Sequence, residues 1–339
     1  MRNQASSMIT GITKRFYRIN LRCVQNVPQR AVLYSRRCMK LLQWTLFIDM
    51  LGYRDINGSI NSEEAAKEFV SFMEENKALF DFQNHDYFVE RYKSYSQFNL
   101  YEFYEVKHAF VSDSLIITFY PKEVELLVDV DKMYMHSANA LFIITMRLQA
   151  FIYNCFSQKG VFLRGGVSNK YCYLKDNFAV GEGLIDSYLV ESKIAKYPRI
   201  ALSEDTSSNK KLMEKIRFLS KVMYNDNQLV ARDPVDDVYY LDYLQYNLTM
   251  IDTSSKFVQA RVLADRKGFD AQFESVELFV KKHGNEIEAK LVELKSRIAP
   301  LTGKDQEAMQ KVINKFEWLK DYHNNLVSKN NLVSQYVIK

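Results

Sequence analysis

The chain has 339 residues, of which 47% are hydrophobic and 26% are charged, with only 11 Gly and 5 Pro. This composition is ordinary for a globular protein and excludes a wholly disordered, collagen-like or low-complexity chain. The length suits one large domain or two modest ones. The net charge of +5 is unevenly placed, because residues 1–48 contain nine basic residues and no acidic one.

The basic residues at the N-terminus set that segment apart from the rest of the chain. We expect a basic extension over residues 1–41, a mixed domain over 42–205 and a mostly helical region over 206–339. Such an arm could contact nucleic acid or anionic lipid, and its composition is also similar to that of a transit peptide. We favour a partly ordered extension or a start site assigned too early, so nucleic-acid binding is kept as an alternative.

Neither a membrane span nor a cysteine framework is expected. No apolar run approaches the ~20 residues of a spanning helix, and the best candidate, Ala138–Met146, is followed by Arg147. The four cysteines lie far apart without a CxxC pair, which argues against a zinc site or disulfides and favours a reducing compartment. No cleavable secretory signal is visible, so we expect no membrane attachment and a cytoplasmic location.

The first predicted elements are a strand, a helix and a hairpin. Trp44–Leu51 is an apolar run that predicts a buried strand ending at Gly52. Residues 61–64 then open a helix, with Asn61 as its cap and a glutamate three residues later, as in a capping box. The runs 101–111 and 115–120 predict a hairpin around Ser112-Asp113-Ser114.

A long helix and two further strands complete the mixed domain. Residues 129–156 predict an apolar helix that is closed by Gly160. Residues 161–168 predict a strand, and we expect 171–174 to pair with it across a tight turn. A helix over 183–196 and a short strand over 198–202 follow. The order β-α-β-β-α-β-β-α-β indicates an α+β fold.

The C-terminal region is predicted to be a helical hairpin. Two amphipathic helices, over residues 273–297 and 305–327, flank a break at Pro300-Leu-Thr-Gly303. The hairpin is expected to pack onto the core, with a dimer contact as the alternative.

Asp49 is the residue that most requires a chemical explanation. A carboxylate within an apolar strand opposes burial unless it is ion-paired or binds a metal. Asp113 offers a second carboxylate at the hairpin tip, so the two could hold hard divalent cations together with backbone carbonyls and substrate phosphates. Such cations neutralise phosphate charge and activate a hydroxyl for attack at phosphorus. On the residues alone, an ion-paired strand acid and an ordinary turn aspartate are the simpler interpretation.

Four segments in order resemble the motifs of class III nucleotidyl cyclases, over about residues 42–205. Residues 47–53 are similar to the D-x-x-G-[FY] strand end, and 112–117 to the hairpin with the second metal-binding acid. Residues 162–168 are similar to the R-x-G-[IV] strand, and 181–191 to the G-x-x-V-N-x-A-x-R-x-E segment. Details such as Asp-Met-Leu-Gly-Tyr and Arg-Gly-Gly are most like the bacterial Pycsar antiphage pyrimidine cyclases.

The resemblance implies a fold, a reaction and a set of partners. The expected fold is class III cyclase-like, with a ferredoxin-like βαββαβ core in residues 42–205 followed by the C-terminal helical hairpin. The implied reaction converts UTP to 3′,5′-cyclic UMP and pyrophosphate, as a second-messenger source in antiphage defence; a cytidylate cyclase making cyclic CMP from CTP is the alternative. The resemblance also implies two Mn²⁺ or Mg²⁺ ions per active site and a homodimer with shared sites.

The resemblance assigns roles to particular residues. Asp49 and Asp113 would bind both metal ions through their carboxylates, with a backbone carbonyl of Ile48 or Met50 as a further ligand. Arg164 is the expected catalytic cation, which we expect to be supplied by the partner subunit. The expected substrate-binding residues are Phe47, Met50, Gly52, Tyr53 and Arg54.

The departures from the family pattern bear on the base and on activity. Ile185 and Leu189 stand where purine cyclases carry the transition-state Asn and Arg, and Ala109 and Phe178 stand where they carry the base-reading Lys and Asp. The chain is therefore either a catalytically inactive, cyclase-like nucleotide-binding module or a cyclase that reads a smaller base. Arg164, Arg54, Arg91 and Lys93 are the candidate replacement cations.

Overall fold

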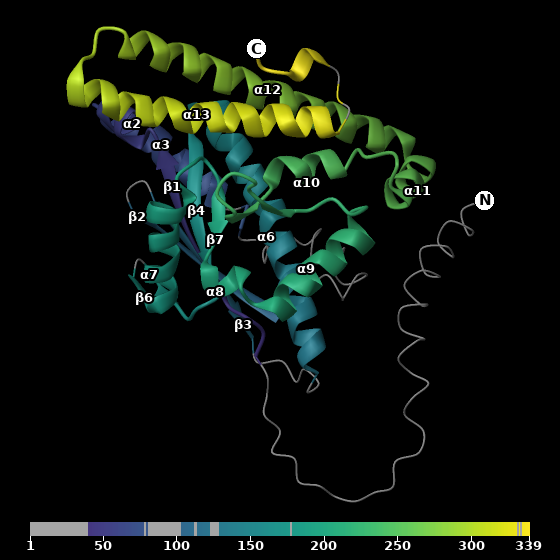
Figure 1. The fold of residues 1–339 in the computed structure, drawn as a ribbon. Coiled ribbons are helices and arrows are strands. Elements are labelled where there is room, and N and C mark those ends of the chain that lie inside the picture. The colour runs from purple at the N-terminus through teal and green to yellow at the C-terminus, as the bar shows by residue number, and fades with distance from the viewer. Residues whose placement is uncertain are drawn as a thin grey trace, which may run out of the picture.

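A seven-stranded sheet forms the centre of the protein, with helices on both faces (Figure 1). The computed structural model describes residues 40–77, 79–80, 103–111, 114–122, 129–176, 178–330, 332 and 334–339. The strand order is β2-β3-β1-β4-β7-β9-β8. The strands are β1 (Trp44–Leu51), β2 (Tyr104–Val111), β3 (Ser114–Pro121), β4 (Phe162–Ser168), β7 (Ile200–Leu202), β8 (Val230–Arg232) and β9 (Tyr239–Leu241).

The first four strands have the ferredoxin-like arrangement. β1 lies between β3 and β4 and is antiparallel to both, and β2 pairs antiparallel with β3. Helices separate β1 from β2 and β3 from β4, which gives the split βαββαβ order. The expected α+β fold, the ferredoxin-like core and the 112–114 connection between two paired strands are thus confirmed, and residues 112–113 themselves lie outside the described part.

The two faces of β1 have different surroundings. Trp44, Leu46, Ile48 and Met50 are buried in the main core. The alternate residues, including Phe47 and Asp49, point to the opposite face because side chains alternate along a strand.

Helix α6 (Val130–Lys159) is the central core helix. The Asp129 carboxylate caps it by accepting the N–H of Asp131 at 3.0 Å, and Gly160 ends it with φ of 64°. Its length and hydropathy suffice for a membrane span, but 67% of the apolar window is buried inside the fold. Its apolar residues are thus accounted for by packing in the core.

The opposite face of the sheet is covered by a helix that changes its pitch. α7 (Glu182–Leu189) continues directly into a π-helix, η3 (Val190–Ala195), and both contact β4. In the part of the chain that the structure describes, the other helices, apart from the C-terminal pair, are α2 (Tyr53–Ser59), α3 (Glu63–Lys77), α8 (Glu204–Ser207), α9 (Lys210–Met223), α10 (Tyr243–Thr249), α11 (Lys256–Ala264) and the 3₁₀ turn η4 (Ser334–Tyr336).

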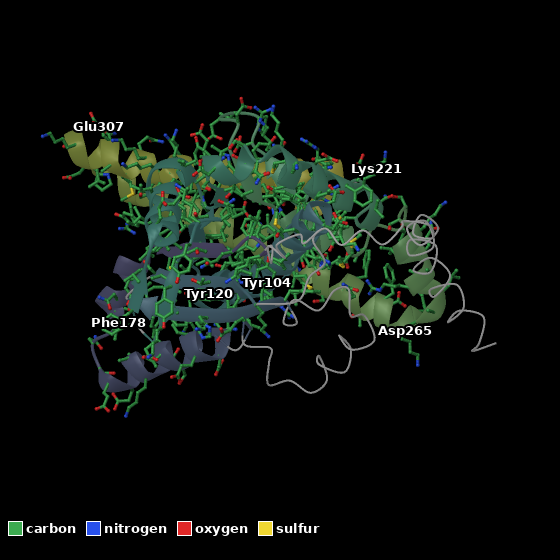
Figure 2. All side chains as sticks on the ribbon, turned by 90° about the horizontal axis from the view of Figure 1, so that it is seen from below. Tyr104, Tyr120, Phe178, Lys221, Asp265 and Glu307 are labelled. Atoms are coloured by element: carbon green, nitrogen blue, oxygen red, sulfur yellow. The ribbon has the colours of Figure 1, made fainter. Side chains whose placement is uncertain are left out.

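The predicted C-terminal hairpin is confirmed as α12 (Arg266–Ile298) and α13 (Gly303–Lys329). Asp265 and Glu307 mark opposite ends of the hairpin in Figure 2. The two helices cross one end of the sheet, above β1 and β4 (Figure 1). Phe162, the first residue of β4, has its ring 5.7 Å from that of Phe316 in α13 and 5.8 Å from His283 in α12.

Two local predictions were wrong, and one short helix was not predicted. The chain forms helix α2 directly after Gly52, and Ser62 rather than Asn61 caps α3, since its Oγ accepts the N–H of Ala65 at 3.2 Å. Residues 171–174 do not pair with β4, because β1 and β7 already occupy both of its edges. β5 (Tyr173–Lys175) instead pairs with β6 (Phe178–Val180) in a separate two-stranded sheet.

The central sheet continues beyond residue 205. β9 pairs with β7, and β8 pairs with β9, so residues 230–241 add two strands to the sheet that holds the ferredoxin-like core.

Candidate functional site

Asp49 lies where the pairing of β1 becomes one-sided. Its register partners are Ser114 in β3 and Arg164 in β4. Among the described residues, the Ser114 pair is the last that β1 makes with β3, whereas pairing with β4 continues to Leu51 and Phe162. The Asp49 carboxylate is 20% exposed, so it is accessible to a small ligand. Asp113 directly precedes Ser114 in the sequence and lies outside the described residues.

Arg164 is held within its own chain by two carboxylates. Its Nε donates to Oε1 of Glu191 at 2.6 Å, and its Nη2 forms a second close contact with the same oxygen. Nη2 also lies 3.4 Å from Oδ2 of Asp49. In the single chain the guanidinium thus stands beside the Asp49 of its own subunit, and the supply of Arg164 to a partner's site stays a prediction.

Glu191 is a functional candidate to which the sequence analysis assigned no role. Only 3% of the residue is exposed, and it lies in the π-helix η3. A π-helical turn inside an α-helix is frequent at functional sites. Glu191 stands at the last position of the segment that resembles G-x-x-V-N-x-A-x-R-x-E, and this motif is the sequence feature that could have pointed to it.

Gly166 in β4 allows the helix that carries Glu191 to approach Arg164, while the neighbouring Gly165 lies close to β1. A Cβ on Gly166 would lie 2.1 Å from the carbonyl oxygen of Ser187 and 2.8 Å from the amide nitrogen of Glu191. A Cβ on Gly165 would lie 2.8 Å from the carbonyl oxygen of Phe47. The Arg-Gly-Gly sequence thus places the cation next to a surface on which the helix can pack without intervening side chains.

Of the predicted substrate-binding residues, Phe47 can offer its side chain to a ligand, whereas Gly52 and Met50 can offer only their backbone. Phe47 is half-buried on the same face as Asp49, with its ring 5.4 Å from that of Tyr188 in α7. Gly52 has φ of 90° and turns the chain from β1 into α2. The side chain of Met50 is buried in the main core, as is that of Ile48, so only their backbone groups can serve a ligand.

Tyr53 and Arg54 begin helix α2. The Tyr53 ring packs 5.7 Å from Phe69 in α3, which gives it a core contact. The side chain of Arg54 is outside the described part, as are Arg91 and Lys93.

A recess of about 270 Å³ opens beside Gly52. It lies between the end of β1, α2, the end of α6 and α12, and its basic lining residues are Lys159 and Lys290. Lys159 is ion-paired with Glu68 at 2.7 Å and Lys290 with Glu293 at 2.8 Å.

The two positions expected to read the base come from neighbouring segments. Ala109 is buried in a small apolar cluster that includes Phe47 and Ala179. Phe178, the residue before Ala179, is 77% exposed and lies at the edge of the molecule (Figure 2). In the single chain, its ring therefore extends away from the Ala109 cluster and does not fill space beside it.

The end of β1 offers oxygen donors to a divalent cation. Among the described residues, no three or more His, Cys, Asp and Glu side chains gather as a metal cluster. The Asp49 carboxylate and the carbonyls at the end of β1 are hard oxygen donors, which Mg²⁺ and Mn²⁺ prefer. The chemistry of these donors fits such an ion, with Asp113 as the expected second carboxylate.

No protein-family model and no curated protein matches the chain. Similar solved structures include the adenylyl cyclase CyaB from P. aeruginosa, with 12% identity and a TM-score of 0.32, covering 59% of this chain and 92% of that chain. They also include the guanylyl cyclase Cya2, with 12% identity and a TM-score of 0.27, covering 60% of this chain and 94% of that chain. The fold assignment above rests on the strand order and register of the chain itself.

Proposed function

We propose that the protein is a nucleotide cyclase that converts UTP to 3′,5′-cyclic UMP and pyrophosphate, as a signal in antiphage defence. The observation that carries this proposal is the position of Asp49, opposite the residue that follows Asp113, at the point where β1 loses its pairing with β3. A carboxylate near the end of one strand and a second that directly precedes the neighbouring strand in the sequence suit a site for two divalent ions. The sequence resemblance to class III cyclases supplies the reaction.

In this reaction the 3′ oxygen attacks the α-phosphorus, and the bond from that phosphorus to the oxygen bridging to the β-phosphate breaks. The 3′ hydroxyl proton leaves to water, and pyrophosphate departs. Asp49 and Asp113 would hold the ions, which would supply positive charge to the phosphates and to the attacking oxygen. Arg164, fixed by Glu191, would keep the Asp49 carboxylate oriented. Gly52 would let the backbone turn next to the triphosphate.

A pyrimidine is the proposed base because the positions that read adenine in relatives are apolar. Ala109 and Phe178 offer neither a donor for a ring nitrogen nor an acceptor for an exocyclic amine. A site lacking these partners leaves the polar groups of adenine unpaired, which lowers its affinity. We propose UTP rather than CTP on the family resemblance alone.

A homodimer with shared sites is part of the proposal. Exposed apolar side chains gather on β6 and α7: Phe178 and Val180 are 77% and 59% exposed, and Ile185 and Tyr188 are 60% and 49% exposed. This surface, which we call the α7 face, borders the site because Tyr188 packs on Phe47. A second copy of the chain is the proposed occupant, since it would bring its own α7 face next to Phe47 and Asp49.

A catalytically inactive nucleotide-binding module is the second candidate. It is favoured by Ile185 and Leu189, which are apolar and exposed on α7 where purine cyclases carry their transition-state residues. Turnover, rather than binding, separates the two candidates.

The test is an incubation of the purified protein with ATP, GTP, CTP or UTP and Mn²⁺, with products separated by chromatography and a chelator control. We expect cyclic UMP and pyrophosphate only when metal is present. CTP as the best substrate would change the base within the proposal, and a purine triphosphate as the best substrate would contradict the argument from Ala109 and Phe178. Binding of nucleotide without any product would favour the inactive module.

A further inference from the structure

The C-terminal hairpin brings side chains to the same end of the sheet as the candidate site. Phe316 of α13 packs on Phe162, which is the register partner of Leu51 at the end of β1. Trp318 of the same helix stacks on Tyr197, with ring centroids 5.1 Å apart, just after η3 ends. α13 therefore passes from the start of β4 to the end of η3, and Arg164 and Glu191 belong to these two elements.

Lys315 precedes Phe316 on this helix and is half-buried. Its charged neighbours are those of the candidate site: burial and the Arg164 guanidinium lower the pKa of Lys315, whereas Asp49 and Glu191 raise it. The hairpin therefore adds the Lys315 ammonium to the charged side chains of the candidate site. The sequence motifs had pointed only to residues within 42–205.

Some charges of this cluster are already paired with one another. Glu191 is buried and binds Arg164 through Nε and Nη2, so the guanidinium is compensated within the protein. Among Asp49, Glu191, Arg164 and Lys315 the positive and negative charges balance. A divalent ion on Asp49 would neutralise that carboxylate, and the Lys315 ammonium would then need an anionic partner.

We propose that Lys315 binds the polyphosphate of the nucleoside triphosphate, as a subsite contributed by the C-terminal hairpin to the candidate active site. The inference rests on the proposed function for the identity of the ligand. An ammonium on a flexible stem suits phosphate oxygens, which it binds as a point charge. Another lysine of the hairpin, Lys290 in α12, lines the recess beside Gly52.

The experiment measures binding separately from turnover. The full-length wild-type protein and the variants Lys315→Gln, Lys315→Arg and Lys304→Gln are titrated with UTP and with inorganic tripolyphosphate, each in the presence of Mn²⁺. Lys304 is the matched control, because it is exposed on the same helix about three turns away. Thermal melting checks that the variants are folded, and Lys315→Met replaces Lys315→Gln if the latter is not.

We expect Lys315→Gln to weaken the binding of both ligands by about ten- to a hundredfold, the effect of losing one hydrogen bond to a charged group. Lys315→Arg should retain most of the affinity, and Lys304→Gln should bind like the wild type. Equal binding by the wild type and Lys315→Gln would overturn the inference and leave the proposed cyclase activity intact. If Lys315→Gln binds more weakly but neither the wild type nor any variant turns over UTP, the subsite is supported and the cyclase activity is contradicted. If the wild type binds neither UTP nor tripolyphosphate, the subsite and the cyclase activity are both overturned.

Discussion

Arg164 and Glu191 form a largely buried ion pair, with Nε 2.6 Å from Oε1, that joins the middle of the sheet to the π-helix covering it. Their side chains are 17% and 4% exposed. Removing one partner of such a pair leaves a poorly solvated charge, which is more costly than the pair itself is stabilising. The pair therefore links the stability of the protein to the orientation of Asp49.

Glu191→Gln tests this link. We expect the free energy of unfolding to fall by about 3 kcal/mol, because Arg164 loses its buried counter-charge. The matched control is Glu182→Gln, whose side chain is 72% exposed and which should change stability by less than about 0.5 kcal/mol. Denaturant unfolding measures both values, and equal stabilities of the two variants would show that the buried pair is not needed for folding.

The two proposed metal-binding carboxylates should behave as one unit. We expect Asp49→Asn and Asp113→Asn each to abolish cyclase turnover, and the double variant to be little worse than either, since residues that act together are not additive. Arg164 keeps Glu191 in the Asp49→Asn variant, so its melting temperature should stay close to that of the wild type. Near-normal turnover by either single variant would contradict the two-metal assignment.

Gly166 should be far less tolerant of substitution than a glycine of α2. Gly166→Ala would place its Cβ 2.1 Å from the Ser187 carbonyl oxygen, so η3 must move away from β4, at an expected cost of about 1–3 kcal/mol. Gly58 has no heavy atom within 4 Å of the same position, and Gly58→Ala in a helix should be neutral or stabilising by about 0.4–1 kcal/mol. Thermal unfolding of the two variants measures the difference, and a stable Gly166→Ala variant would contradict the close packing described for η3.

Sequence patterns predicted those parts of the fold that depend on local periodicity. β1, the β2–β3 pair, α6 and the C-terminal hairpin were all visible in this way. The pairing of β5 with β6 was missed because it depends on both edges of β4 being occupied, and strand neighbours cannot be read from one strand.

The candidate site shows the same limit. Asp49 was visible as an acid in an apolar run, but its contact with Arg164 depends on the register of two strands that lie 115 positions apart. The position of Lys315 depends on how a separate hairpin crosses the sheet. No spacing within residues 42–205 could have indicated it.

His283 and His323 join the two hairpin helices through a buried hydrogen-bonded chain. Their Nδ1 atoms lie 2.9 Å apart, and His283 Nε2 is 2.7 Å from the Tyr243 hydroxyl. His323 Nε2 lies 2.8 Å from the carbonyl oxygen of Tyr336, so this nitrogen must carry a proton. His283 Nδ1 then donates to His323 Nδ1, and Tyr243 donates to His283. The geometry suits two neutral imidazoles.

This chain should make stability fall at low pH. Burial holds the pKa values of His283 and His323 below their usual range, so the unfolded state binds more protons below about pH 6.5. The free energy of unfolding should therefore decrease as the pH falls, by up to about 1.4 kcal/mol per pH unit for each histidine.

His283→Gln removes one such group and should make the decrease shallower. Asp242 acts in the opposite direction, because burial raises the pKa of its carboxyl to about 6, but this contribution is common to both proteins and cancels in the difference. Urea unfolding between pH 5 and pH 8 compares the slopes. Parallel curves for the two proteins would contradict the proposed contribution of the histidine chain.

The α7 face provides the test of the proposed dimer. Phe178 and Val180 are both exposed on β6, and their backbones pair with Lys175 and Tyr173 rather than with a core strand. Phe178→Glu with Val180→Glu should therefore leave the monomer folded but place two charges in the proposed interface, where they would be desolvated without partners. We expect light scattering to show a dimer for the wild type and a monomer for this variant, and turnover to fall with the dimer fraction.

Val235→Glu, at a residue that is 78% exposed in the segment between β8 and β9, is the control and should remain dimeric. A wild type that is monomeric and active would contradict shared sites, and a dimer unaffected by the double substitution would mean that another surface joins the two copies.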